Sequence, residues 1–134
     1  MPEDNFFESK IVLEAITEIM QLQNQVLVFA EYAEYASISE QQDNLDVLRR
    51  LMAKQRNMCF RCTMSDSPSA KELLSEVLNH FSKYGHTVDL ENPMAVFTEV
   101  EENLDDIEFE LDYYSKYGRY PDEDGGETPP TTMF

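Results

Sequence analysis

The sequence predicts an all-α protein, an up-and-down bundle of about four helices, on the basis of three observations. Hydrophobic side chains recur at alternating steps of three and four residues along most of the 134-residue chain, which is the spacing of one helix face. Helix-start signals precede three of these apolar segments. No segment has the strict alternation of apolar and polar residues that is typical of a β-strand. A chain of this length is sufficient for one hydrophobic core and too short for two.

The first predicted helix runs from Phe6 to about Ala36. Its main apolar stripe consists of Val12, Ile16, Ile19, Val26, Ala30 and Ala33, and it is widened by Ile11, Ala15, Leu22 and Phe29. A helix that is apolar over so much of its surface must be covered on two sides, either by several other helices or by a second copy of the chain. We therefore expect a homodimer that forms through this helix.

The second predicted helix begins after Ser37 and ends near Met64. Two overlapping capping boxes mark its start, because Ser37 is followed by Glu40 and Ser39 by Gln42 at the required spacing. Its inner side is formed by Leu45, Leu48, Met52, Met58, Cys59 and Cys62.

The third and fourth predicted helices each begin with a cap residue followed by proline, whose missing N–H costs no hydrogen bond at that position. Ser67-Pro68 starts the third helix, and Gly85 is placed to end it in a left-handed conformation. Asn92-Pro93 starts the fourth helix, which ends at Tyr117. The apolar face of the third helix consists of Leu73, Leu74, Val77, Leu78, Phe81 and Tyr84. The corresponding seam of the fourth helix consists of Phe97, Val100, Leu104, Ile107, Leu111 and Tyr114.

The composition changes after Tyr117. Residues 118–134 are dominated by glycine, proline and acidic residues, which neither form a helix nor bury a core. The sequence therefore predicts a helical domain over residues 1–117 and a flexible, disordered acidic tail over residues 118–134.

The formal net charge of −17 argues against direct binding to nucleic acid or to an anionic membrane, because proteins that bind phosphates normally present a basic surface. No apolar run is long enough to cross a bilayer. The N-terminus also lacks the basic region and apolar block of a secretory signal, and the chain has only two cysteines. We therefore expect a cytoplasmic protein.

Half of the positive charge lies on the second predicted helix. This basic patch consists of Arg49, Arg50, Lys54, Arg56 and Arg61. Three interpretations of the patch are open. It pairs with acidic side chains of the first and fourth predicted helices, it binds an acidic partner protein or a second subunit, or, with the least support, it contacts nucleic acid.

The fourth predicted helix and the tail carry twelve acidic residues against Lys116 and Arg119. We predict that this helix binds a basic surface of a partner protein, with exposed tyrosines as anchors. The predicted binding residues are Glu101, Asp105, Asp106, Glu108, Asp112, Tyr113, Tyr117 and Tyr120. Two alternatives remain open. The acidic helix imitates the phosphates of DNA and occupies a nucleic-acid-binding protein, or its acidic side chains only solvate it.

Cys59 and Cys62 form a C-x-x-C motif, the spacing of zinc sites and of thiol oxidoreductases. A structural zinc ion needs four ligands, and His80 and His86 are the only further histidine or cysteine candidates. Redox motifs of this spacing begin a helix after a strand, whereas this one lies near the end of a predicted helix. The simpler interpretation is two small apolar side chains that pack one turn apart. A metal- or thiol-dependent function is therefore the least favoured alternative.

No other pattern indicates catalysis. The chain has no E-x-x-H pair, no G-x-S-x-G and no phosphate-binding loop. We therefore predict that the protein is not an enzyme and that it uses no metal and no cofactor.

The chain resembles a small uncharacterised family of cyanobacterial proteins, a domain of unknown function also found in phages that infect cyanobacteria. The resemblance covers about residues 6–112 and is strongest in the opening segment. Its residues are Phe6-Phe7-Glu8-Ser9, Ile11-Val12, Glu14-Ala15, Arg50-Leu51-Met52, Arg56, Arg61, Phe81, Tyr84-Gly85, Met94 and Phe97. The resemblance implies an all-helical fold and a cyanobacterial setting, and it implies no catalytic site. Lys10, the C-x-x-C motif and the long acidic tail depart from the family pattern and fit a divergent, phage-encoded member.

These observations together predict a non-enzymatic regulatory or adaptor protein. It acts by binding another protein in a cyanobacterial cytoplasm. In a phage, the expected role is to modulate a host complex such as the transcription machinery.

Overall fold

A computed structural model describes residues 6–89 and 91–121, and these residues form four α-helices and two short 3-10 helices. The all-α prediction and the number of helices are confirmed. The elements are η1 (Phe6–Glu8), α1 (Lys10–Tyr32), η2 (Ala33–Tyr35), α2 (Ile38–Met64), α3 (Pro68–Lys83) and α4 (Ala95–Tyr117). Most of the predicted acidic tail, residues 122–134, lies outside the described residues.

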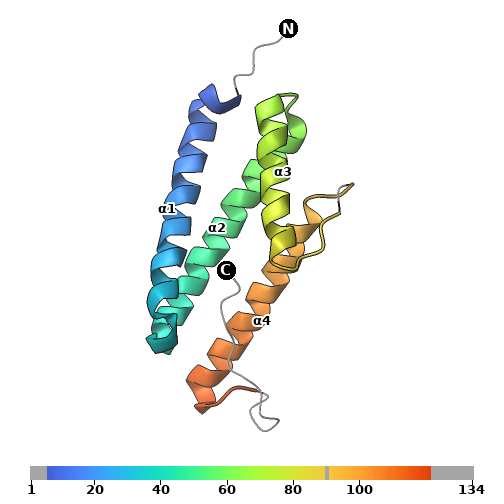
Figure 1. Ribbon diagram of the computed structural model, residues 1–134. Coiled ribbons are helices and arrows are strands. Elements are labelled where there is room, and N and C mark those ends of the chain that lie inside the picture. The colour runs from blue at the N-terminus through green and yellow to red at the C-terminus, as the bar shows by residue number, and fades with distance from the viewer. Residues whose placement is uncertain (1–5, 90, 122–134) are drawn as a thin grey trace.

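The longest helix, α2, is central, and each of the other three helices packs against it (Figure 1). α1 and α2 form an antiparallel pair, and α3 runs antiparallel to the C-terminal half of α2. α4 covers the N-terminal half of α2 and continues in the direction of α3 instead of reversing it. α3 and α4 therefore follow each other along one side of α2.

The core lies along α2 in two clusters. The smaller cluster joins Val12, Met58, Cys62 and Ala70, near the start of α1 and α3. The larger cluster contains Leu48 of α2 together with most of the apolar seam of α4. Phe97, Val100 and Leu104 in that seam have no exposed surface, which agrees with the three-four spacing of the sequence.

Two predicted helix starts are found where the sequence puts them. Ser37 and Glu40 form the reciprocal capping box of α2, because each backbone N–H donates to the side-chain oxygen of the other residue at 3.1 Å. The Ser67 hydroxyl accepts a hydrogen bond from the N–H of Ala70 at 3.2 Å, ahead of α3. Gly85 adopts the predicted left-handed conformation, with φ of +87°.

The predicted bounds of the first helix and the predicted start of the fourth are wrong. α1 begins at Lys10 because Ser9 caps it, so Phe6–Glu8 form a separate turn. At its other end the regular helix stops at Tyr32, and Ala33–Tyr35 tighten into 3-10 geometry. Before α4 the backbone makes a further turn, in which the carbonyl of Asn92 accepts a hydrogen bond from the N–H of Ala95 at 3.1 Å. α4 consequently starts two residues after the predicted proline.

None of the helices within the described residues combines the length and the apolar composition that a membrane span requires.

Candidate functional site

Six of the eight acidic residues of α4 fall into an inner row, which borders α2, and an outer face, which points away from it. The inner row consists of Glu101, Asp105, Glu108 and Asp112, which recur at steps of three and four residues. The last of these, Asp112, accepts a hydrogen bond from the side-chain amide of Gln42 on α2 at 3.2 Å. The inner row is therefore engaged with α2 as well as exposed to solvent.

Two arginines of α2 bind the rest of the inner row. Arg49 Nη2 lies 2.7 Å from Asp105 Oδ1 and 2.5 Å from Glu108 Oε2. Arg56 Nη1 lies 3.3 Å from Glu101 Oε1. Partial burial acts to lower the pKa of Arg49, but hydrogen bonds to Asp105 and Glu108 outweigh it and raise this pKa, so the guanidinium remains charged. These ion pairs fix α4 against α2.

The basic patch of the sequence is divided by the fold. Arg49, Arg56 and Lys54 are paired within the chain, the last with Glu18 of α1. Arg50 and Arg61 are exposed and make no ion pair with any residue that the structure describes. The internal-pairing interpretation therefore applies to three of the five basic residues, and the other two remain accessible.

Replacing Arg49 with alanine is expected to lower the free energy of unfolding by about 1 kcal/mol, because its two carboxylate partners are more than half exposed. The loss should shrink in high salt, which screens surface charges. Arg50→Ala is the matched control, since Arg50 is a neighbouring arginine on the same helix. Urea unfolding at low and high salt measures both variants. Equal losses in Arg49→Ala and Arg50→Ala would contradict a structural role for the ion pairs.

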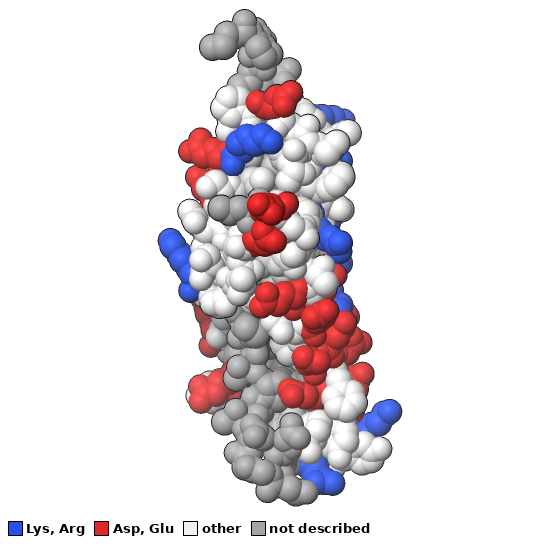
Figure 2. All heavy atoms as spheres, turned by 90° about the vertical axis from the view of Figure 1, so that its right-hand side faces the viewer, with Lys and Arg blue, Asp and Glu red and all other residues white. Residues whose placement is uncertain are grey.

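The outer side of α4 combines acidic and aromatic residues that recur every three or four positions. We define the acidic-aromatic face as Glu102, Asp106, Phe109, Tyr113 and Tyr117. The rings form a continuous ladder, with centroids 6.2 Å apart between Phe109 and Tyr113 and 4.5 Å apart between Tyr113 and Tyr117. Phe109 is 62% exposed and Tyr117 63% exposed. Figure 2 shows acidic side chains gathered in the lower part of the face that it presents.

The predicted binding residues are therefore distributed over three environments. Asp106, Tyr113 and Tyr117 lie on the acidic-aromatic face. Glu101, Asp105, Glu108 and Asp112 form the inner row. Tyr120 lies beyond α4, with its ring centroid 4.5 Å from that of Tyr114.

Sequence reasoning missed Glu102 and Phe109 as parts of this face. The spacing could have identified both residues, because Glu102 lies four residues before Asp106 and Phe109 lies three residues after Asp106, on the same side of a helix. Phe109 is not among the predicted binding residues, because only tyrosines were predicted as anchors.

The two cysteines lie side by side in the core. Both thiols are free, and Cys59 and Cys62 are 1% and 0% exposed. Burial raises the pKa of Cys59 to about 12, with a further contribution from Cys62, and burial also raises the pKa of Cys62. A raised pKa suppresses the thiolate, which is the reactive and metal-binding form. The arrangement suits packing and does not suit thiol chemistry.

The two histidines lie on or after α3. His86 is buried, with its ring against Phe81 and its Nδ1 3.4 Å from Glu99 Oε1. The His80 ring lies 4.8 Å from the Tyr84 ring, centroid to centroid, in a tilted arrangement. Within residues 6–89 and 91–121, no group of three or more histidine, cysteine or acidic side chains is arranged to hold a metal ion.

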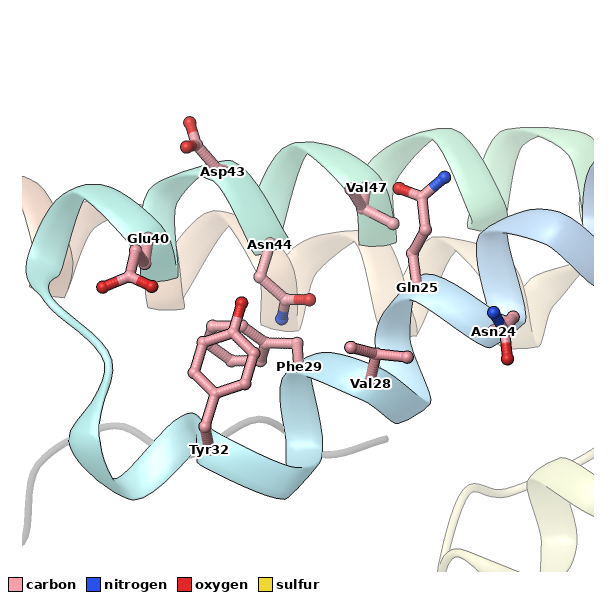
Figure 3. Close-up of a pocket in the computed structure, with 9 residues that line it drawn as sticks. All are labelled: Asn24, Gln25, Val28, Phe29, Tyr32, Glu40, Asp43, Asn44 and Val47. Carbon is pink, nitrogen blue, oxygen red and sulfur yellow. The ribbon is translucent and has the colours of Figure 1, made fainter.

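A groove of about 330 Å³ opens between the end of α1 and the start of α2 (Figure 3). The side chains of Tyr32 and Asn44 point toward each other across it from the two helices, and Phe29 contributes its ring. Glu40 and Asp43 add negative charge from α2. This groove was not predicted, because its residues come from two helices.

No protein-family model matches the chain, and the searches of curated proteins and of solved structures find no match either.

Proposed function

We propose that the protein is a non-enzymatic adaptor or regulatory protein that binds a basic surface of a partner protein through the acidic-aromatic face. The observation that carries this proposal is the ladder of Phe109, Tyr113 and Tyr117 in line with Glu102 and Asp106, in which Phe109 and Tyr117 are exposed and Tyr113 is partly buried. Large exposed aromatic residues in one patch are typical of interaction surfaces, where they supply most of the binding energy. Acidic residues beside them attract a basic partner and accelerate the encounter.

The division of the acidic residues supports the same conclusion. The inner row is engaged by Arg49, Arg56 and Gln42 on α2. By contrast, Glu102 and Asp106 are exposed and make no ion pair with any described residue. Their charge is available to a partner without the loss of an internal contact. A binding role therefore fits the outer face better than the inner row.

Two other functions are less well supported. Mimicry of DNA requires negative charge spaced along the length of a rod, but aromatic rings replace charge over the C-terminal half of the outer face. A thiol-dependent activity requires an accessible thiolate, and both thiols are buried with raised pKa values.

The biological setting of this proposal comes from the family resemblance. On that resemblance, the proposed setting is a cyanobacterial cytoplasm, and in a phage the proposed target is a host complex such as the transcription machinery. Such complexes commonly present basic surfaces because they hold nucleic acid.

Asp106→Lys is expected to abolish capture of the partner. The experiment exposes the tagged protein to nuclease-treated cyanobacterial lysate, washes at low and high salt, and identifies bound proteins by mass spectrometry. The wild type should retain a discrete partner at low salt and lose it at high salt, because screening weakens charge attraction. Asp46→Lys is the matched control, since it makes the same charge change at an exposed site on α2.

Substitution of an aromatic residue tests the aromatic part of the acidic-aromatic face. Phe109→Ala should reduce capture, whereas Phe60→Ala, at a similarly exposed site on α2, should leave it unchanged. Equal capture by all variants would overturn the proposal. A partner that is displaced by added DNA or RNA from the wild type would instead favour the mimicry alternative.

A further inference from the structure

α1 carries an apolar stripe on the side that faces away from α2. Leu13, Met20 and Leu27 recur every seven residues, and these side chains are 49%, 62% and 66% exposed. Val28 lies beside the stripe and is also half exposed. None of the described helices covers this surface. Exposed apolar side chains repeated along one side of a helix are typical of an interface, although the exposed Thr17 and Asn24 lie between them here.

Met20, Leu27 and Val28 lie in a part of α1 that is free of charge, whereas Leu13 lies next to Glu14. From Ile19 to Ala30 the sequence contains no acidic or basic residue, although the whole chain has a net charge of −17. Two such chains repel each other over most of their surfaces. Repulsion is weakest where the charge is missing, so the middle of α1 is the surface at which two copies approach most readily.

We propose that this stripe binds the same stripe of a second copy, so that two α1 helices pack antiparallel about a two-fold axis at Met20. Symmetric dimers use one self-complementary surface on both copies. The spacing of the stripe meets this requirement, because Leu13 and Leu27 each lie seven residues from Met20. In the antiparallel arrangement Leu13 of one copy packs against Leu27 of the other.

Charge at the two ends of α1 determines the antiparallel direction. Lys10 lies ten residues before Met20, and Glu31 lies eleven residues after it. Antiparallel packing therefore places Lys10 of one copy near Glu31 of the other. Parallel packing would instead bring Lys10 near Lys10 and Glu31 near Glu31, and both contacts are repulsive. Within its own chain Lys10 Nζ lies 3.9 Å from Glu14 Oε1, and both side chains are mostly exposed, so the partner's Glu31 adds a second carboxylate to the same ammonium group.

The dimer differs from the proposed partner binding in its location and in its response to salt. One helix from each copy forms a small interface, so association is weak and depends on concentration. Salt screens the repulsion between the two acidic chains and therefore strengthens the dimer, whereas it weakens binding at the acidic-aromatic face. The dimer leaves both α4 helices accessible, which makes it bivalent toward a partner.

Met20→Glu is expected to weaken self-association by about tenfold or more, because it places two like charges at the two-fold axis. Sedimentation of the full chain from low micromolar to millimolar concentration, at low and high salt, measures the effect. Met64→Glu is the matched control, since Met64 is equally accessible on α2, at 73% exposure, and should dimerise like the wild type. A wild type that stays monomeric at every concentration, or equal weakening in both variants, would overturn the proposal.

Cysteine cross-linking tests whether the two α1 helices of the dimer are antiparallel. Leu13→Cys and Leu27→Cys proteins are mixed and oxidised, and the antiparallel dimer predicts that the mixed disulfide predominates. The native thiols do not interfere because they are buried. Predominance of Leu13→Cys homodisulfides would indicate parallel packing and would overturn the proposed arrangement, whatever the outcome of the partner-capture experiment.

Discussion

Phe97→Ala is expected to lower the free energy of unfolding by about 3–5 kcal/mol and the Tm by about 10–20 °C. Phe97 has no exposed surface, and its ring meets that of Phe81 edge to face at 5.2 Å. This contact joins the start of α4 to the end of α3, two helices that otherwise share few contacts because they lie end to end along α2. Its loss leaves a cavity and also loosens the junction between α3 and α4.

The matched control is Phe109→Ala, the same substitution on the same helix at a site that is 62% exposed. It should change the free energy of unfolding by about 0.5 kcal/mol or less, since an exposed ring forms little of the core. Thermal and urea unfolding followed by circular dichroism distinguish the two variants. Similar losses would mean that Phe109 is part of the core, which would also remove it from the proposed binding face.

Cys59 is expected to react with a thiol reagent about a thousandfold more slowly in the folded protein than in denaturant, and Cys62 is expected to react more slowly as well. The reagent attacks the thiolate, and burial raises the pKa of Cys59 from an ordinary value near 9 to about 12. Steric exclusion acts in the same direction, because Cys62 has no exposed surface. The measurement is the rate of reaction with Ellman's reagent near neutral pH, with and without guanidinium.

Phe60→Cys provides the internal reference. It adds a thiol at a 56% exposed site next to the native pair, and that thiol should react at the rate of a free cysteine. Fast reaction of a native cysteine in the folded protein would contradict the packing role. That result would instead favour a thiol-dependent function of the C-x-x-C motif.

The helices were predictable because their signals are local. The caps at Ser37 and Ser67 and the left-handed Gly85 act within a few residues, and the apolar spacing reports one helix face at a time. The two errors at helix starts have different origins. The start of α1 follows from a local signal that was overlooked, the N-cap serine Ser9. The start of α4 depends on a backbone turn from Asn92 to Ala95, which composition does not encode.

The candidate site was predictable only in part. The sequence correctly indicated that α4 is acidic and rich in aromatic residues, but it did not separate the inner row from the outer face. Phe109 was not predicted as part of the face because only tyrosines were predicted as anchors, and its exposure is decided by which side of α4 meets α2.

The sequence by itself determined an all-helical protein with four helices, one basic patch and one acidic helix, because periodicity, capping and charge are properties of short segments. Only the tertiary structure decided that α2 is central, that α3 and α4 follow each other along it, and which charges remain available. Arg49 forms an ion pair with Asp105, which lies 56 residues away in the sequence. Coulomb attraction and hydrogen bonding act over a few ångströms in space, whatever the separation along the chain. Which charged residues form pairs therefore depends on how the helices pack.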